Sequence, residues 1–117
     1  MPLIKVQTSV NSPEKSQVDS LLTTLSSKLA QHLGKPESYV MTIFEANIPM
    51  TFGGTLEPVC FMEIKNIGTM QPAKTSAMSQ DFCSLIESEL GIATNRIYIE
   101  FADAQRHLWG WDKKTFA

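Results

Sequence analysis

The chain of 117 residues is short of cysteine, of net charge and of long apolar runs. Two cysteines, Cys60 and Cys83, are too few for a disulfide framework, so a reducing, cytoplasmic location is expected. A net charge of −2 offers no basic surface for nucleic acid or anionic lipid. No apolar run approaches the roughly 20 residues that span a membrane, and no secretory signal is visible. We therefore expect neither a nucleic-acid partner nor a membrane partner.

Residues that hold metals or cofactors are equally sparse. His32 and His107 have no metal-ligand spacing with Cys60 or Cys83. The Gly53-Gly54 pair fits no phosphate-binding loop. His32 is expected to be an exposed helix residue near the helix end. We expect no metal and no cofactor.

The first half of the chain has the pattern of a strand, a helix and a second strand. Residues 2–9 favour a strand, and in the turn that follows Ser12 can cap a helix while Pro13 suits its first position. Gly34 is a typical residue for the end of that helix, and residues 39–45 predict the second strand. The apolar stripe of the helix consists of Val18, Leu21, Leu22, Leu25, Leu29 and Leu33.

The second half repeats this plan after about 57 residues. Residues 59–64 predict a strand, Pro72 opens a helix that ends before Gly91, and residues 96–101 predict the last strand. Each crossover is long enough to join two parallel strands. The pattern predicts one domain over residues 1–117 with an α+β fold. In it, duplicated β-α-β units form a four-stranded mixed sheet with two helices on one face.

The second face of this sheet has no helix to cover it. The strands at 59–64 and 96–101 are apolar enough to favour burial on both faces. We therefore expect an oligomer in which several sheets share an interior. The C-terminal segment 108–116 is too aromatic for a free tail and is expected at a subunit junction.

Short motifs follow one another in a specific order from the first residue to the last. They are Met1-Pro2, Gly34-Lys35-Pro36, Phe52-Gly53-Gly54, Glu57-Pro58, Ile67-Gly68, Arg96-Ile97-Tyr98-Ile99, Gly110-Trp111 and Thr115-Phe116-Ala117. In this order they resemble the macrophage migration inhibitory factor family of the tautomerase superfamily. The resemblance implies a homotrimer of β-α-β-β-α-β protomers with active sites between subunits. It also implies keto–enol tautomerisation of small acids of the phenylpyruvate or dopachrome type.

Pro2 gains a catalytic role from this resemblance. Taken alone, a proline at this position suits the start of an edge strand. Removal of Met1 would expose its secondary amine, and an apolar pocket lowers the pKa of an amine toward neutrality, where proton transfer is efficient. The apolar walls are expected from Leu3, Trp109, Trp111 and Phe116. Without the resemblance, these residues fit a plain subunit interface equally well.

The resemblance also implies three substrate contacts. Lys35 would meet the substrate carboxylate, and the backbone N–H of Ile67 would meet the same group. Tyr98 would reach the site from the neighbouring protomer. On residue type alone, Lys35 is a solvated lysine at a helix end and Tyr98 a structural strand residue.

Two positions depart from the family pattern. Glu100 stands where the family frequently has asparagine, and a carboxylate there repels an acidic substrate unless it is protonated or paired, for example with Lys35 or Arg106. Trp109 is bulkier than the aliphatic residue often found at its position, which narrows the pocket. Substrate preference is therefore open.

A second function, as a cytokine-like receptor-binding protein, is the alternative. Cys60 lacks the second cysteine of the Cys-x-x-Cys pair found in the animal cytokines, so thiol–disulfide chemistry is not expected. Ser12 and Asn47 replace the arginine and aspartate associated with receptor binding. These replacements favour the enzyme. Leaderless secretion leaves no mark in a sequence, so an extracellular location also stays open.

Overall fold

A computed structural model describes all of residues 1–117. Its main elements are β1 (Leu3–Thr8), α1 (Lys15–Leu33), β2 (Met41–Glu45), β3 (Cys60–Ile67), α2 (Pro72–Leu90) and β4 (Ile97–Ala104). A C-terminal hairpin follows, formed by β5 (Gly110–Trp111) and β6 (Lys114–Thr115). Three single 3₁₀ turns connect elements: η1 (Glu37–Tyr39), η2 (Thr94–Arg96) and η3 (Arg106–Leu108).

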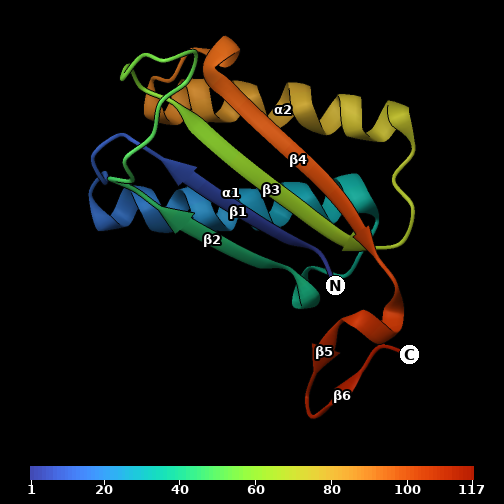
Figure 1. The fold of residues 1–117 in the computed structure, drawn as a ribbon. Helices are drawn as coiled ribbons and strands as arrows, with labels where there is room; N and C mark the ends of the chain where they lie inside the picture. Colours follow the sequence, from blue (N-terminus) through green and yellow to red (C-terminus); the bar gives the residue numbers. More distant parts are fainter.

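The four long strands form one mixed sheet in the order β2-β1-β3-β4. Strand β1 runs parallel to β2, and β3 runs parallel to β4, because a helix joins the members of each pair. The two halves meet through the antiparallel pair β1 and β3. Both helices lie on one face of the sheet (Figure 1). The predicted duplicated α+β architecture is confirmed.

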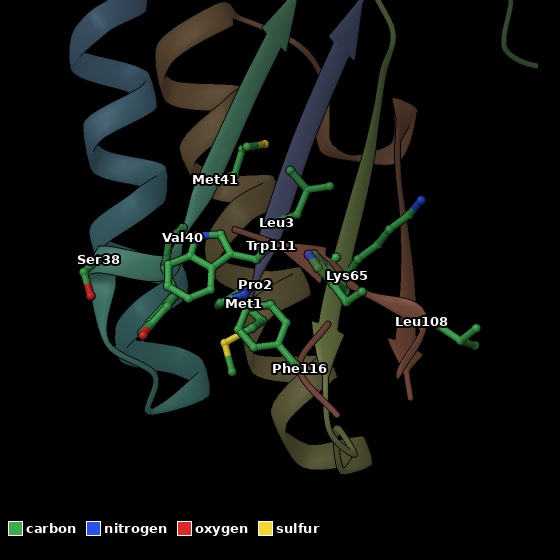
Figure 2. Close-up of a pocket in the computed structure, with 13 residues that line it drawn as sticks. Met1, Pro2, Leu3, Ser38, Val40, Met41, Lys65, Leu108, Trp111 and Phe116 are labelled. Atoms are coloured by element: carbon green, nitrogen blue, oxygen red, sulfur yellow. The ribbon is translucent and has the colours of Figure 1, made fainter. Parts of the chain in front are cut away.

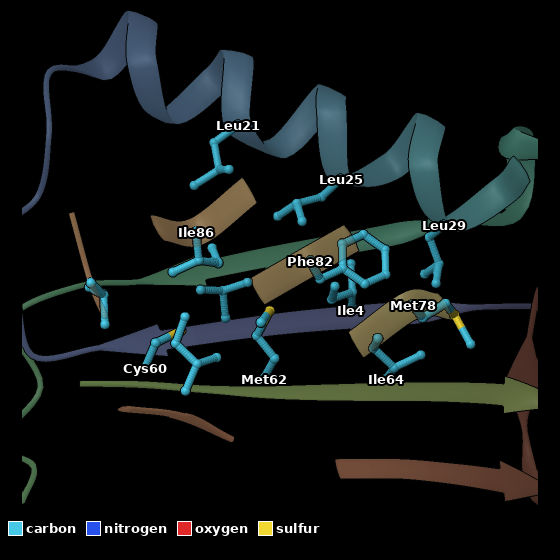
Figure 3. Close-up of a cluster of buried hydrophobic side chains, with 13 residues drawn as sticks. Ile4, Leu21, Leu25, Leu29, Cys60, Met62, Ile64, Met78, Phe82 and Ile86 are labelled. Atoms are coloured by element: carbon cyan, nitrogen blue, oxygen red, sulfur yellow. The ribbon is translucent and has the colours of Figure 1, made fainter. Parts of the chain in front are cut away.

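The core lies between this sheet face and the two helices (Figure 3). Alternate residues of β1, such as Ile4 and Val6, are fully buried against the helices. Phe82 at the centre of α2 is also fully buried, and burying such a side chain contributes roughly 1.5–3 kcal/mol. The helices contribute every third or fourth residue to this core: Leu21, Leu25 and Leu29 from α1, and Met78, Phe82 and Ile86 from α2.

The helix ends agree with the sequence pattern at both C-termini and at the start of α2, which begins at Pro72 as predicted, but not at the start of α1. Gly34 and Gly91 both adopt the left-handed conformation that ends a helix, with φ of 61° and 68°. The predicted cap at Ser12 is wrong, because α1 begins at Lys15 and no side chain caps it. The Ser12 hydroxyl instead donates to the carbonyl of Pro13 at 3.2 Å, a local bond that competes with capping.

The second face of the sheet is uncovered in this chain, and its centre is charged. Glu63 on β3 lies 3.8 Å from the ammonium of Lys5 and 3.6 Å from that of Lys65. The expectation that these strands favour burial on both faces is therefore wrong at the centre of this face, where Glu63 and Lys65 follow Phe61 at alternate positions of β3. The predicted oligomer remains a prediction.

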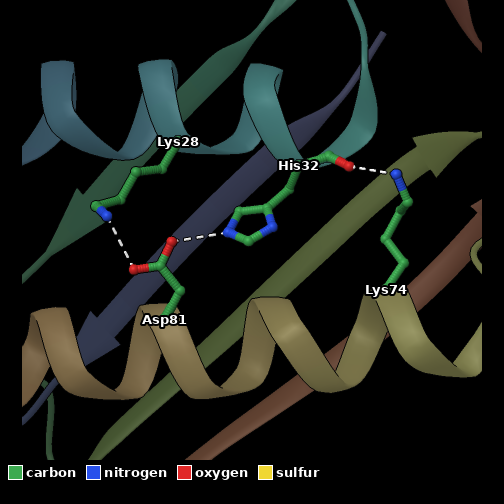
Figure 4. A network of polar contacts seen from close by, with 4 residues as sticks. All are labelled: Lys28, His32, Lys74 and Asp81. Atoms are coloured by element: carbon green, nitrogen blue, oxygen red, sulfur yellow. Dashed lines mark hydrogen bonds and ion pairs between the residues drawn. The ribbon is translucent and has the colours of Figure 1, made fainter.

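His32 connects the two helices rather than facing solvent, so the expectation of an exposed histidine is wrong (Figure 4). Its ring Nε2 lies 2.7 Å from Asp81 on α2, and the Lys28 ammonium lies 2.8 Å from the other oxygen of that carboxylate. The ring also packs against Phe82, with centroids 5.6 Å apart. Lys74 donates to the His32 carbonyl, and Gln17 near the start of α1 donates to the Glu89 carbonyl at 3.0 Å, so α2 holds α1 near both ends.

Neither helix combines the length and apolar character needed to cross a membrane.

Candidate active site

Two adjoining pockets open at the N-terminal end of β1, and Met1 lines both of them. The first pocket has a volume of ≈ 590 Å³ and is mostly apolar. The second has a volume of ≈ 470 Å³ and contains basic side chains. Met1 is therefore the boundary between an apolar compartment and a basic one.

The apolar pocket brings together five of the residues singled out in the sequence (Figure 2). They are Pro2, Leu3, Trp109, Trp111 and Phe116. The hairpin β5–β6 makes this possible, because it folds back and stacks Trp111 on Phe116 with ring centroids 5.7 Å apart and planes at 9°. Tyr39 in η1 forms T-shaped contacts with both rings, and its ring centroid lies 5.6 Å from that of Trp111 and 6.3 Å from that of Phe116.

Sequence reasoning missed Tyr39 as a wall of this pocket. It was assigned to a strand, whereas the strand begins two residues later at Met41 and Tyr39 ends a 3₁₀ turn. The Pro36 that precedes the turn was the available signal, since proline at that position ends one helix and favours a new turn.

The basic pocket contains Lys35 and Ile67, the two residues expected to meet a carboxylate. Gly34 turns the chain out of α1, and the Lys35 ammonium then reaches the end of β3, where it donates to the carbonyl of Ile67 at 3.1 Å. Gly68, Ala104, Gln105 and Arg106 complete the lining together with Met1. The carboxyl ends of β3 and β4 thus meet the end of α1.

Gly68 lines the basic pocket, and the buried Asn66 lies close to it. Gly68 has a φ of +124°, and a Cβ placed on it would lie 3.9 Å from the Lys35 ammonium and 3.8 Å from the Asn66 side-chain nitrogen. Asn66 is only 2% exposed, and its side-chain oxygen has no hydrogen-bond partner. No sequence pattern pointed to Asn66, because it stands in a strand among apolar residues.

The α-amino group at this end of the chain is perturbed. Burial lowers the pKa of the Met1 amine from its ordinary value of 8.0, and the nearby positive charge of Lys35 lowers it further. Pro2 behind it is fully buried. An amine at this position is therefore held closer to its neutral form than an ordinary chain terminus.

Tyr98 and Glu100 do not reach either of these two pockets within the chain. Tyr98 pairs with Phe61 on β3, whereas the residue that pairs with Leu3 is Lys65. The separation is four residues along β3, or about 13 Å at the usual rise per residue. Glu100 is exposed, lies opposite Glu63 and forms no ion pair with Lys35 or Arg106.

Arg96 organises the loop beside Tyr98. Its guanidinium donates to the carbonyls of Pro58 at 2.8 Å, Glu57 at 2.9 Å and Phe52 at 3.3 Å. It also lies over the Phe52 ring at 5.4 Å from the centroid, and that ring meets Tyr98 edge-on at 4.9 Å. Tyr98 itself is 65% exposed.

The two thiols lie away from these pockets and are poor nucleophiles. Burial, with a smaller effect of Cys83, raises the pKa of Cys60 to about 12. Burial also raises the pKa of Cys83, although a hydrogen bond with Ser79 opposes it.

Comparison with known proteins places the chain in a family. The family model described as macrophage migration inhibitory factor (MIF) matches residues 1–117. The chain belongs to the macrophage migration inhibitory factor family. This family includes tautomerases and cytokines.

Relatives match the whole chain. The macrophage migration inhibitory factor of Meriones unguiculatus is 34% identical over 117 residues, with 100% of both chains covered. A solved structure of a macrophage migration inhibitory factor homologue from Prochlorococcus marinus is 48% identical, with a TM-score of 0.93 and coverage of 98% of this chain and 99% of that one. The protein from Toxoplasma gondii is 28% identical, with a TM-score of 0.90 and coverage of 97% and 99%. The likeness therefore extends over both β-α-β units and the C-terminal hairpin.

Proposed function

We propose that this protein is a cofactor-free keto–enol tautomerase whose catalytic base is the amine of Pro2, exposed when Met1 is removed. The observation that carries the proposal is the position of Met1 between the apolar and basic pockets. Loss of Met1 frees the secondary amine of Pro2 and joins the two compartments around it. An acid with an apolar body then fits with its carboxylate on one side of the amine and its body on the other.

The surroundings of Pro2 suit a base that works near neutral pH. Burial and the Lys35 charge lower the pKa of the Met1 amine. We expect the same two causes to act on the Pro2 amine once Met1 is removed, because Pro2 is buried and lines the same apolar pocket. A base with a pKa near the working pH is both sufficiently deprotonated and able to return its proton. No side chain carboxylate or histidine lines either compartment to take this role instead.

The proton transfer needs this amine, a bound carboxylate and water as the proton source for oxygen. The Lys35 ammonium and the backbone N–H of Ile67 hold the carboxylate of a 2-oxo acid. In the keto-to-enol direction, the neutral Pro2 amine removes a proton from C3, the electron pair moves onto the carbonyl oxygen, and this oxygen takes up a proton from water while the protonated amine returns one to solvent. In the reverse direction the protonated amine donates its proton to C3, and the enol oxygen loses its proton to water. Phenylpyruvate is a suitable test substrate, because its ring matches the apolar wall of Trp109, Trp111 and Phe116.

A homotrimer completes the site in this proposal. Tyr98 lies too far along the sheet to reach the Pro2 of its own chain, and Glu100 lines neither pocket, so both act on a neighbouring copy in this proposal. The uncovered face of the sheet and the exposed ring of Tyr98 support such an assembly.

Kinetics of three forms test the proposal. Intact-mass measurement should show that Met1 is absent from the active protein. Pro2→Gly and a form with one residue added before Pro2 should each lose at least 100-fold in kcat/KM for phenylpyruvate, within the range expected for a positioned acid–base group. Pro13→Gly is the matched control, because Pro13 lies outside both pockets. Full activity in either altered form would rule out the Pro2 amine as the base.

A further inference from the structure

The combined site carries an unusual charge for this protein. The chain has 12 acidic and 10 basic residues, yet the two pockets contain three basic side chains and no acidic one. Lys65 lines the apolar pocket, while Lys35 and Arg106 line the basic one. A cavity lined by one sign of charge favours a ligand of the opposite sign.

Two of these three charges have no acidic partner in the chain. The Lys65 ammonium lies 3.6 Å from the Glu63 carboxylate, which balances its charge. Lys35 donates only to the Ile67 carbonyl, and Arg106 forms neither an ion pair nor a side-chain hydrogen bond. Asp103 lines an adjoining hollow that shares Gly68, Ala104 and Gln105 with the basic pocket, and it forms no ion pair with Arg106.

We propose that Arg106 binds a second carboxylate of the substrate, so that the preferred substrates are short 2-oxo acids with two carboxylates. This inference rests on the proposed function, in which Lys35 and Ile67 hold the first carboxylate. Arg106 comes from a different element, η3, and its planar guanidinium binds a carboxylate with two parallel hydrogen bonds. Because both cations line one pocket, a short acid with a carboxylate at each end can contact both of them, and a four-carbon skeleton is the test case.

The test compares 2-oxobutanedioate with its 4-methyl ester, which has the same skeleton but only one charge. Wild type should use the diacid at least about tenfold better in kcat/KM, the usual effect of one charge-assisted hydrogen bond. Arg106→Gln should lose most of this preference through a higher KM for the diacid, with a much smaller change for the ester. Lys15→Gln, which removes an exposed lysine of α1, is the matched control for loss of one positive charge.

Three results would overturn the proposal. The first is equal use of the diacid and the ester by wild type. The second is an equal loss for both in Arg106→Gln. The third is that Arg106→Gln lowers kcat/KM for every substrate and that adding Glu100→Gln restores it. This result would show that Arg106 merely neutralises Glu100 of a neighbouring copy.

A binding measurement separates this proposal from the proposed function. If wild type shows no Pro2-dependent turnover of phenylpyruvate or of either probe, the tautomerase function fails. The binding of butanedioate and of its monomethyl ester can then be measured by the fluorescence of Trp109 and Trp111. This measurement tests the second carboxylate site independently of catalysis. Tighter binding of the diacid that is lost in Arg106→Gln supports the second carboxylate site, and equal binding contradicts it.

Discussion

The ammonium of Lys35 donates a hydrogen bond to the carbonyl of Ile67 over 3.1 Å. This contact joins the residue just after α1 to the last residue of β3, at the point where the basic pocket begins. It occupies one of three ammonium protons, so two remain for a carboxylate. The lysine is thereby aimed at the site before any substrate binds.

Replacement of Lys35 should weaken the binding of every acidic substrate. Lys35→Met keeps the aliphatic stem but removes the charge, and the KM for phenylpyruvate should rise about tenfold or more. Steady-state kinetics with Lys15→Met as the exposed control measure the effect. An unchanged KM would show that the carboxylate does not bind at this lysine.

Gly68 should be needed both for the backbone and for the space in the basic pocket. At a φ of +124° an alanine is strained, which costs roughly 1–3 kcal/mol of unfolding free energy. Gly68 also lines the pocket, so the methyl group of Gly68→Ala takes up space beside the Lys35 ammonium, at a contact distance of 3.9 Å, and the KM for acids should rise in addition.

The control for Gly68→Ala is Gly91→Ala, which is similarly strained at φ +68° but meets no atoms within 4 Å. Chemical denaturation should show a loss of stability in both variants, with a change of KM only in Gly68→Ala. A change of KM in both would attribute the effect to global destabilisation.

Arg96 should hold the loop of residues 52–58 in place. Arg96→Lys retains the charge above Phe52 but cannot reproduce the donors to Pro58, Glu57 and Phe52, so unfolding free energy should fall by roughly 1–3 kcal/mol. Hydrogen exchange should accelerate for the amides of this loop, while the amides of β1 stay protected. Uniform acceleration over the whole sheet would mean that Arg96 supports the fold rather than the loop.

The ion pair between Lys28 on α1 and Asp81 on α2 should make the unfolding free energy depend on pH in the acidic range. Burial alone would raise the pKa of the Asp81 carboxyl, but hydrogen bonds from Lys28 and His32 outweigh it, and the pKa is lowered from 3.8. Because the folded-state pKa lies below the unfolded one, the stabilisation is fully present above pH 3.8 and is lost as the pH falls through the folded value.

Asp81→Asn should therefore reduce the unfolding free energy at neutral pH by roughly 1 kcal/mol, since the carboxylate is partly exposed. The difference from wild type should shrink below the folded pKa. Denaturation of both proteins between pH 7 and pH 2.5 measures this, and a difference that stays constant across the range would exclude the ion pair as its source.

The parts of the fold that followed from sequence are those set by local chemistry. Gly34 and Gly91 end their helices because only glycine adopts the left-handed conformation without strain. The stripe containing Leu21, Leu25 and Leu29 is buried because its spacing matches the helical repeat. Ser12 did not cap α1, since a serine has several local hydrogen bonds available and the sequence does not say which one forms.

The parts of the site that sequence could not predict depend on distant contacts. The resemblance grouped Pro2 with Trp111 and Phe116, and the folded hairpin brings them to one pocket. Arg106 joins Lys35 only because the ends of β4 and α1 meet across β3. His32 seemed an ordinary exposed histidine because Asp81, its partner, stands 49 residues away.

Titration of the Pro2 nitrogen tests the central claim most directly. With ¹⁵N-labelled proline in the processed protein, only the terminal nitrogen among the six prolines can titrate. If Pro2 is the base, this nitrogen has a pKa below the ordinary α-amino value of 8.0, and kcat/KM for phenylpyruvate rises with pH through the same pKa. A Pro2 pKa at or above 8.0, or a rate profile governed by a different pKa, would contradict the role of Pro2 as the catalytic base.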